Sequence, residues 1–230
     1  MVVNPKPTRM IDCNELYNKF NYFCKYFYCP NEILIIDCRS FSEYEEGHII
    51  NSIHMKSNDD ELLIPYGKRI EIIPNIIIYD NNCEDIMLSK GGYEEFSARF
   101  PFMRTTKMIY TLCELSEIPS YPYEIIPNSL YIGNFEQATA TYVQKNLRIN
   151  VHVNCTNKIG SYISESENLL QLNISDSDED IYSKIETCNN FIEIHLRQFH
   201  RILIFSDNGV GRSAIFVLGF LMNLYKISYE

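Results

Sequence analysis

The sequence predicts an α/β protein with two domains, each built on a parallel β-sheet flanked by helices. Two short apolar runs in the first half, Ile33–Ile36 and Ile76–Tyr79, have the length of buried strands. Near the end, Arg201–Phe205 is another such run, and Ala214–Leu224 is an apolar run of helical length. A chain of 230 residues with 46% hydrophobic residues can form two small globular domains.

The first predicted domain covers residues 10–101 and carries a series of short motifs. Its first strand ends in a charged tripeptide, and a Glu-Tyr pair and a Gly-His-Ile tripeptide follow. In order they are Asp37-Cys38-Arg39, Glu43-Tyr44 and Gly47-His48-Ile49. This pattern resembles the rhodanese domain, which implies a parallel sheet.

The resemblance also implies that this domain has no sulfur-transfer activity. A rhodanese enzyme has its sulfur-carrying cysteine directly after the second buried strand, and Asp80 occupies that position. Cys38 and Cys83 are the nearest thiols, and we interpret both as ordinary cysteines. The interval from Tyr79 to Gly91 is short, because a crossover between parallel strands needs about 10 to 12 residues for its helix alone. We therefore expect a helix and a strand to be missing, so that the sheet is incomplete.

Residues 102–122 are predicted to be a linker, because they include Pro119 and Pro122. Residues 123–230 are predicted to form the second domain. This domain opens with Tyr123–Asn134, including a Leu-Tyr-Ile-Gly strand. Ile149–Cys155 alternates as a sheet strand does, and Leu169–Ile174 supplies another. Apolar residues at helical spacing then predict a helix between Ile181 and Phe199, which returns the chain to the strand Arg201–Phe205.

The segment between this strand and the last helix is suited to binding phosphate. Gly209 and Gly211 permit tight curvature, so backbone N–H groups can turn inward, and the helix that starts near Ser213 directs its positive end at a bound anion. Arg212 can donate bidentate hydrogen bonds to two phosphate oxygens. Glycine-bearing loops between a strand and a helix are common, however, and a Walker loop is excluded because its earlier glycine and its lysine are absent.

The spacing in this loop resembles the signature of protein tyrosine phosphatases, and in particular of their dual-specificity branch. Phe205 occupies the histidine position of that signature, and Ser206 occupies the position of the nucleophilic cysteine. Asp176 lies where the family has its general acid, although it also belongs to an acidic run that caps the following helix.

The replaced cysteine predicts a site that binds phosphate without hydrolysing its ester. A serine hydroxyl is far less acidic than a thiol and needs an adjacent general base, and Asp207 is the one candidate in the loop. Ser206 and Asp176 are therefore predicted to be degenerate catalytic positions. The predicted phosphate-binding residues are Ser206, Asp207, Asn208, Gly209, Val210, Gly211 and Arg212.

Two inactive domains in this order resemble the STYX-like pseudophosphatases over about residues 10 to 225, in a shortened form. The resemblance implies a catalytically inactive scaffold that regulates phosphorylation signalling and binds proteins, including phosphoproteins or other phosphatases. Docking to MAP kinases is disfavoured, since between Gly47 and Pro74 the basic residues Lys56, Lys68 and Arg69 are outnumbered by acidic ones. The alternatives are a dual-specificity phosphatase with residual activity and a structural adaptor with a vestigial loop.

Composition excludes several other classes. The net charge of −10 argues against nucleic acid as a partner, and the eight scattered cysteines give no zinc pattern, so we expect neither metal nor cofactor. The absence of an apolar amino-terminal signal favours an intracellular location, in the cytoplasm or alternatively the mitochondrion. The chain stops at Glu230, so we expect the carboxy-terminal helices of a phosphatase domain to be missing. The helix Ala214–Leu224 would then expose an apolar patch, although it is too short to span a membrane.

Overall fold

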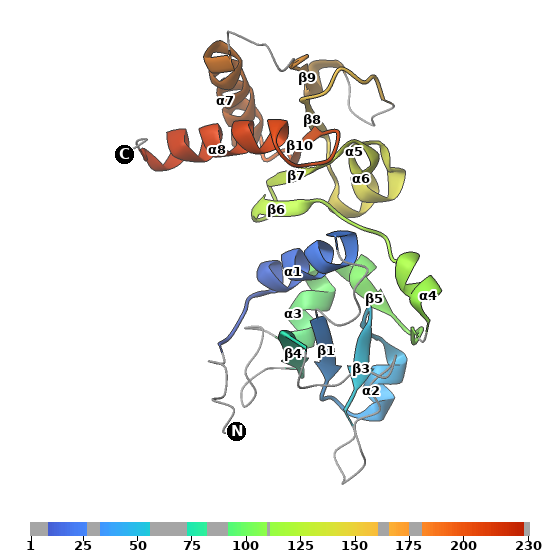
Figure 1. The fold of residues 1–230 in the computed structure, drawn as a ribbon. Coiled ribbons are helices and arrows are strands. Elements are labelled where there is room, and N and C mark those ends of the chain that lie inside the picture. The colour runs from blue at the N-terminus through green and yellow to red at the C-terminus, as the bar shows by residue number, and fades with distance from the viewer. Residues whose placement is uncertain are drawn as a thin grey trace, which may run out of the picture. The chain divides into compact units, whose positions relative to one another are not determined.

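A computed structural model describes residues 9–26, 33–55, 73–81, 92–109, 111–160, 166–174 and 181–227. The chain divides into two compact units, Met1–Pro119 and Ser120–Glu230 (Figure 1). We call them the amino-terminal and the carboxy-terminal unit and describe each by itself. Both are α/β structures with parallel strands and flanking helices, so the predicted fold class is confirmed.

The amino-terminal unit contains a three-stranded parallel sheet in the order β3-β1-β4. Its elements are α1 (Cys13–Tyr26), β1 (Ile33–Asp37), α2 (Phe41–Glu46), β2 (His48–Ile49), β3 (Ser52–His54), β4 (Asn75–Tyr79), α3 (Gly92–Arg99), a 3-10 turn (Pro101–Met103), β5 (Arg104–Thr105) and α4 (Leu112–Ser116). The two apolar runs predicted as strands are thus confirmed as β1 and β4. In the register of the sheet, Ile35 pairs with Ile77 of β4 and with Ser52 of β3.

Helices α1 and α3 contact each other and bury aromatic side chains. Tyr17 of α1 stacks on Phe100 with ring centroids 4.5 Å apart, and the Phe96 ring of α3 lies 5.3 Å from that of Phe100. Phe20 and Phe96 are fully buried. Burial of large aromatic surfaces is the main stabilising contribution here. The helix and strand expected to be missing between Tyr79 and Gly91 fall on residues 82–91, which lie outside the described residues.

The segment predicted as a linker, residues 102–122, contains short regular elements. Its strand β5 pairs antiparallel with β2, and the Arg104 guanidinium donates a hydrogen bond to the Glu46 carbonyl at 2.7 Å. Helix α4 begins with a capping box, in which the Thr111 hydroxyl and the Glu114 carboxylate each bond the other's backbone N–H. The first residues of this segment therefore belong to the fold of the amino-terminal unit.

The carboxy-terminal unit is a five-stranded sheet in the order β6-β7-β10-β8-β9. Its elements are β6 (Tyr123–Ile126), β7 (Leu130–Asn134), α5 (Phe135–Thr139), α6 (Thr141–Leu147), β8 (Val151–Asn154), a 3-10 turn (Ser166–Asn168), β9 (Leu169–Gln171), α7 (Ile181–Arg197), β10 (Ile202–Ser206) and α8 (Arg212–Tyr225). All pairs are parallel except β6 with β7. Helices α5 and α6 cover one face of the sheet, and α7 and α8 cover the other (Figure 1).

Strand β10 is the centre of this sheet, and all five of its residues are buried. A strand covered on both faces needs an apolar sequence, which is why Ile202–Phe205 is a continuous apolar run. The predicted helices are confirmed as α7 and α8. Within the described residues, no helix combines the length and the apolar character that crossing a lipid bilayer requires.

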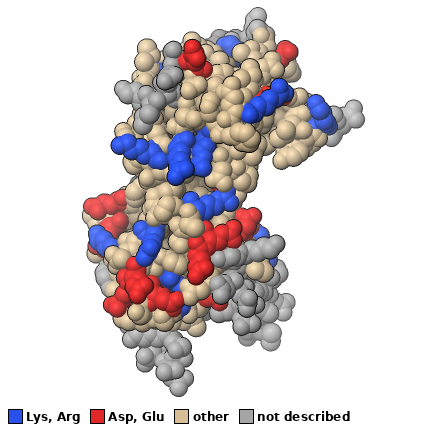
Figure 2. All heavy atoms as spheres, turned by 180° about the vertical axis from the view of Figure 1, so that it is seen from behind, with Lys and Arg blue, Asp and Glu red and all other residues tan. Residues whose placement is uncertain are grey.

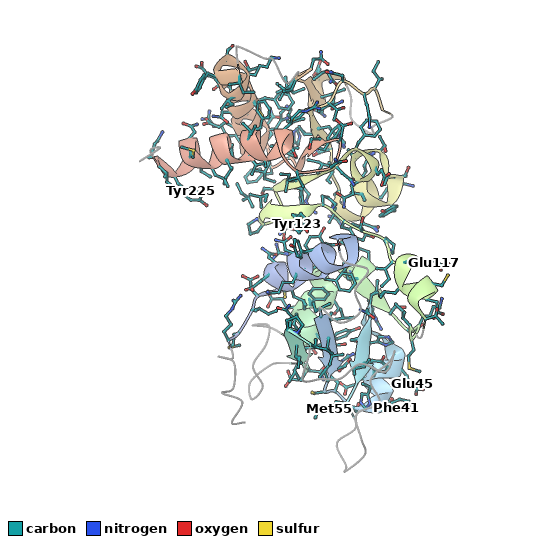
Figure 3. All side chains as sticks on the ribbon, viewed as in Figure 1. Phe41, Glu45, Met55, Glu117, Tyr123 and Tyr225 are labelled. Carbon is teal, nitrogen blue, oxygen red and sulfur yellow. The ribbon has the colours of Figure 1, made fainter. Side chains whose placement is uncertain are left out.

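Helix α8 is apolar on its exposed side as well as on its buried side. Phe216, Val217 and Phe220 are buried, whereas Ile215 and Leu218 are 47% and 58% exposed. Tyr225, labelled in Figure 3, ends this helix and is 64% exposed. The apolar patch expected on this helix is present.

Candidate functional site

The candidate site lies where strand β10 ends and helix α8 begins. Strands β7 and β8 flank β10 in parallel, so the residues that follow all three strands gather at one edge of the sheet. In open α/β sheets this carboxyl edge is the usual place for a ligand. Residues 207–211 form the loop at this edge, and α8 starts directly after Gly211.

The loop has the backbone geometry that its glycines predict. Gly209 and Gly211 have φ angles of 72° and 82°, in the left-handed region that favours glycine. Gly209 also packs against the end of β7, where an added Cβ would lie 2.9 Å from Gly133 backbone atoms. None of the N–H groups of residues 208–211 donates to a described residue. The loop therefore has backbone donors available for an anion.

Replacing Gly209 by alanine is expected to destabilise the carboxy-terminal unit. The positive φ angle is strained for alanine, and its Cβ would require Gly133 or the loop to shift, so we expect a loss of about 1–2 kcal/mol. Urea denaturation of the full chain measures this loss. Gly211→Ala is the matched control, because its φ angle is similar but an added Cβ meets nothing within 4 Å. Equal stability of the two variants would contradict the close packing of Gly209.

Ser206 lies at the base of the loop and is buried. Its hydroxyl oxygen is 2.9 Å from the Ser213 hydroxyl and 3.3 Å from the Val210 carbonyl oxygen. Neither partner is a base, and among the described residues the Ser206 hydroxyl has no other partner. The described contacts of this hydroxyl therefore include no general base, which a serine nucleophile would need.

The residues around Ser206 are apolar or held neutral. Phe205 is fully buried, with its ring 6.2 Å from that of Phe135 on one side and 6.2 Å from His152 on the other. Burial lowers the pKa of His152 to about 4, so this imidazole is neutral at physiological pH. Burial also raises the pKa of Cys188 to about 12, and that of Cys155 is raised for the same reason. Both groups are therefore neutral thiols near physiological pH, and the thiolate is the reactive form.

Three charged side chains meet at the mouth of the loop. The Lys158 ammonium lies 2.7 Å from one oxygen of the Asp207 carboxylate, and the Arg212 guanidinium lies 3.8 Å from the other. Arg212 also donates to the Ile174 carbonyl at 3.2 Å. The pKa of Asp207 is lowered, mainly by the hydrogen bond from Lys158. Both cations thus lie beside Asp207, the first residue of the loop.

Lys158 was not among the residues predicted from the sequence. It follows β8, and β8 lies beside β10, so its place at the carboxyl edge follows from the strand order. That order was not part of the sequence prediction. The predicted residues Ser206 to Arg212 all lie in or beside the loop, whereas Asp176 lies outside the described residues.

Figure 2 shows a face of the molecule on which Asp and Glu side chains gather over the amino-terminal unit. Asp80 follows β4 at the carboxyl edge of the three-stranded sheet, where the rhodanese resemblance would require a cysteine. Cys38 follows the neighbouring β1, and burial raises the pKa of its thiol.

Phe41 and Met55, 48% and 45% exposed, lie at the same end of this unit (Figure 3). Cys83 lies outside the described residues.

No metal centre is built by either unit within the described residues. No group of three or more His, Cys, Asp and Glu side chains there could hold a metal ion.

Two protein families match this chain. The family described as "Dual specificity phosphatase, catalytic domain" matches residues 130–230, and the family described as "Rhodanese-like domain" matches residues 29–88. These matches correspond to the carboxy-terminal and the amino-terminal unit respectively.

Curated relatives combine the same two kinds of domain or have one of them. A probable rhodanese domain-containing dual specificity protein phosphatase of Dictyostelium discoideum is 28% identical over 148 residues, covering 63% of this chain and 31% of the relative. A probable dual specificity protein phosphatase of the same organism is 38% identical over 103 residues, covering 44% of this chain and 47% of the relative. The chain thus spans less than half the length of these two relatives.

Among solved structures, human tyrosine phosphatase-like serine/threonine/tyrosine-interacting protein is 25% identical in sequence to the aligned part. The alignment covers 47% of this chain and 77% of that protein, with a TM-score of 0.42.

Proposed function

We propose that this protein, which combines a rhodanese-like domain with a domain of the dual-specificity phosphatase family, is a catalytically inactive pseudophosphatase that binds phosphorylated proteins through its β10–α8 loop. In this proposal it is of the same kind as the STYX-like serine/threonine/tyrosine-interacting-like proteins and acts as a scaffold in phosphorylation signalling. Its partners would be phosphoproteins or the phosphatases that compete for them.

The environment of Ser206 carries the proposal. Phosphatases of this family need a thiolate at this position, whereas a serine would need a base to remove its proton. The Ser206 hydroxyl contacts a carbonyl oxygen and the Ser213 hydroxyl instead. The only carboxylate of the loop, Asp207, is engaged by Lys158 and Arg212.

Phosphate binding remains available without a nucleophile. The free N–H groups of the loop, the start of α8 and the Arg212 guanidinium together favour an anion. A neutral hydroxyl at position 206 also repels a phosphoryl dianion less than a thiolate would.

Arg212→Ala is expected to weaken the binding of inorganic phosphate by about 1.5–3 kcal/mol, because one charge-assisted contact is lost. Isothermal titration calorimetry on the full chain measures the loss. Arg197→Ala is the matched control, since this arginine lies on α7, is 79% exposed and pairs with Glu193. If Arg212→Ala leaves phosphate binding unchanged, the loop is not the phosphate site, and the result favours a structural adaptor with a vestigial loop.

Residual phosphatase activity is the competing function, and the names of the curated relatives favour it. Turnover of an aryl phosphate by the unchanged protein, abolished by Ser206→Ala, would establish it. The proposal expects no turnover above that of the Ser206→Ala variant.

A further inference from the structure

One of the charged side chains at the mouth of the loop comes from a different segment of the chain. Arg212 belongs to the loop, but Lys158 comes from the segment that follows β8. The backbone of Lys158 is fixed by two hydrogen bonds, since its carbonyl accepts from the Asn154 amide at 2.9 Å and its N–H donates to the Thr156 hydroxyl at 3.0 Å. Its ammonium group lies 5.3 Å from the centre of the Phe135 ring. Lys158 is therefore anchored at the edge where the loop opens.

Asp207 neutralises the cations that would otherwise face the loop. One of its oxygens is 2.7 Å from Lys158 and the other is 3.8 Å from Arg212. A carboxylate and a phosphoryl group compete for the same donors, because both accept charge-assisted hydrogen bonds from a guanidinium or an ammonium. The loop thus carries its own anion beside the place where a phosphoryl group would bind.

We propose that Lys158 is a second phosphate-binding residue, and that a phosphoryl dianion enters the loop by displacing the Asp207 carboxylate from Lys158 and Arg212. This inference rests on the proposed function of the loop. Asp207 then sets the affinity threshold, so that a dianion binds and a singly charged carboxylate side chain of an unphosphorylated protein does not.

The displacement is feasible because the contacts are partly open to solvent. The side chain of Lys158 is 59% exposed, and those of Asp207 and Arg212 are each 34% exposed. Ion pairs at such positions are weak, since water and salt screen them. A dianion attracts each cation more strongly than the singly charged carboxylate does. Asp207 stays ionised near neutral pH even when it is displaced, because the ordinary pKa of an aspartate lies far below neutrality. One anion therefore replaces another.

The test is the affinity of the full chain for inorganic phosphate at constant ionic strength, measured by isothermal titration calorimetry. Asp207→Asn is expected to tighten binding about threefold to tenfold, because the competing charge is removed while the shape is kept. Lys158→Met is expected to weaken binding about threefold to tenfold, because one charge-assisted contact is lost. Melting temperatures without phosphate establish that each variant is folded.

Two controls separate a local effect from the change in net charge. Glu136→Gln removes an exposed carboxylate from the first turn of α5, and Lys145→Met removes an exposed ammonium from α6. Both are expected to leave the phosphate affinity within about twofold of the unchanged protein, because screened surface charges contribute little.

The outcomes distinguish this inference from the proposed function. If phosphate binds through Arg212 but Asp207→Asn binds no tighter, or Lys158→Met binds equally well, the inference is overturned and the proposed function stands. If neither the unchanged protein nor Asp207→Asn binds phosphate, the proposed function is overturned together with the inference. A gain from Glu136→Gln equal to that from Asp207→Asn would also overturn the inference, because net charge alone would explain it.

Discussion

Hydrolysis of an aryl phosphate is expected to rise at least about 10³-fold over the unchanged protein when Phe205→His and Ser206→Cys are combined. A thiol at position 206 would lie where the serine hydroxyl is now 2.9 Å from the Ser213 hydroxyl. If the Ser213 hydroxyl donates to the sulfur, it favours the thiolate. The loop N–H groups and the start of α8 lower the thiol pKa further. Steady-state kinetics with the aryl phosphate measure the gain.

Control variants identify the source of that gain. Adding Arg212→Ala to the double variant should remove most of the activity, because the transferred phosphoryl group loses its bidentate ligand. Adding Asp176→Asn should lower it if this carboxylate protonates the leaving group, as the family resemblance implies. A folded double variant that binds phosphate through Arg212 yet hydrolyses nothing would refute a preserved catalytic arrangement.

The central part of the site could be predicted from the sequence because its signals are local. An apolar run fully buried in the sheet, glycines at positive φ angles and an apolar helix follow each other between Ile202 and Tyr225. Each of these features depends on neighbouring residues, so periodicity and backbone sterics suffice. The same holds for β1, where a run of isoleucines leads into Asp37.

Contacts between distant segments could not be predicted in this way. Lys158 meets Asp207 only because β8 and β10 are neighbours in the sheet, and no local pattern indicates that pairing. Strands β2 and β5 have two residues each, too few for an alternating pattern, so the sequence around Arg104 was interpreted as a linker. Arg39 is a third case, since the aromatic rings that it packs on, Tyr79 and Tyr93, come from β4 and α3.

Loss of the Arg39 side chain should strongly destabilise the amino-terminal unit. Its side chain is 4% exposed and forms a two-pronged ion pair with Asp37, which is fully buried. The guanidinium also donates to the Gly47 carbonyl at 2.7 Å and lies 3.5 Å from the centre of the Tyr93 ring. The Asp37 carboxylate in turn accepts from the Tyr79 hydroxyl at 2.6 Å. This network joins β1, β4, α3 and the end of α2 around one buried charge pair.

Arg39→Met is expected to lower the free energy of unfolding by about 3–5 kcal/mol, because it leaves the Asp37 carboxylate buried without its cation. Urea denaturation of the full chain, followed by far-ultraviolet circular dichroism, measures the loss. Arg9→Met is the matched control, since Arg9 is 64% exposed and its ion pair with Glu15 is on the surface. This control should unfold at nearly the same urea concentration as the unchanged protein.

A double-mutant cycle decides whether the cost arises from the unpaired charge or from lost packing. Adding Asp37→Asn to Arg39→Met removes the buried charge, so the double variant should be more stable than the sum of the two single losses predicts. If the losses are simply additive, the ion pair contributes no coupling and the packing of Arg39 on Tyr93 is the main term. A loss below about 1 kcal/mol for Arg39→Met would contradict the buried network altogether, because unpaired buried charges are costly.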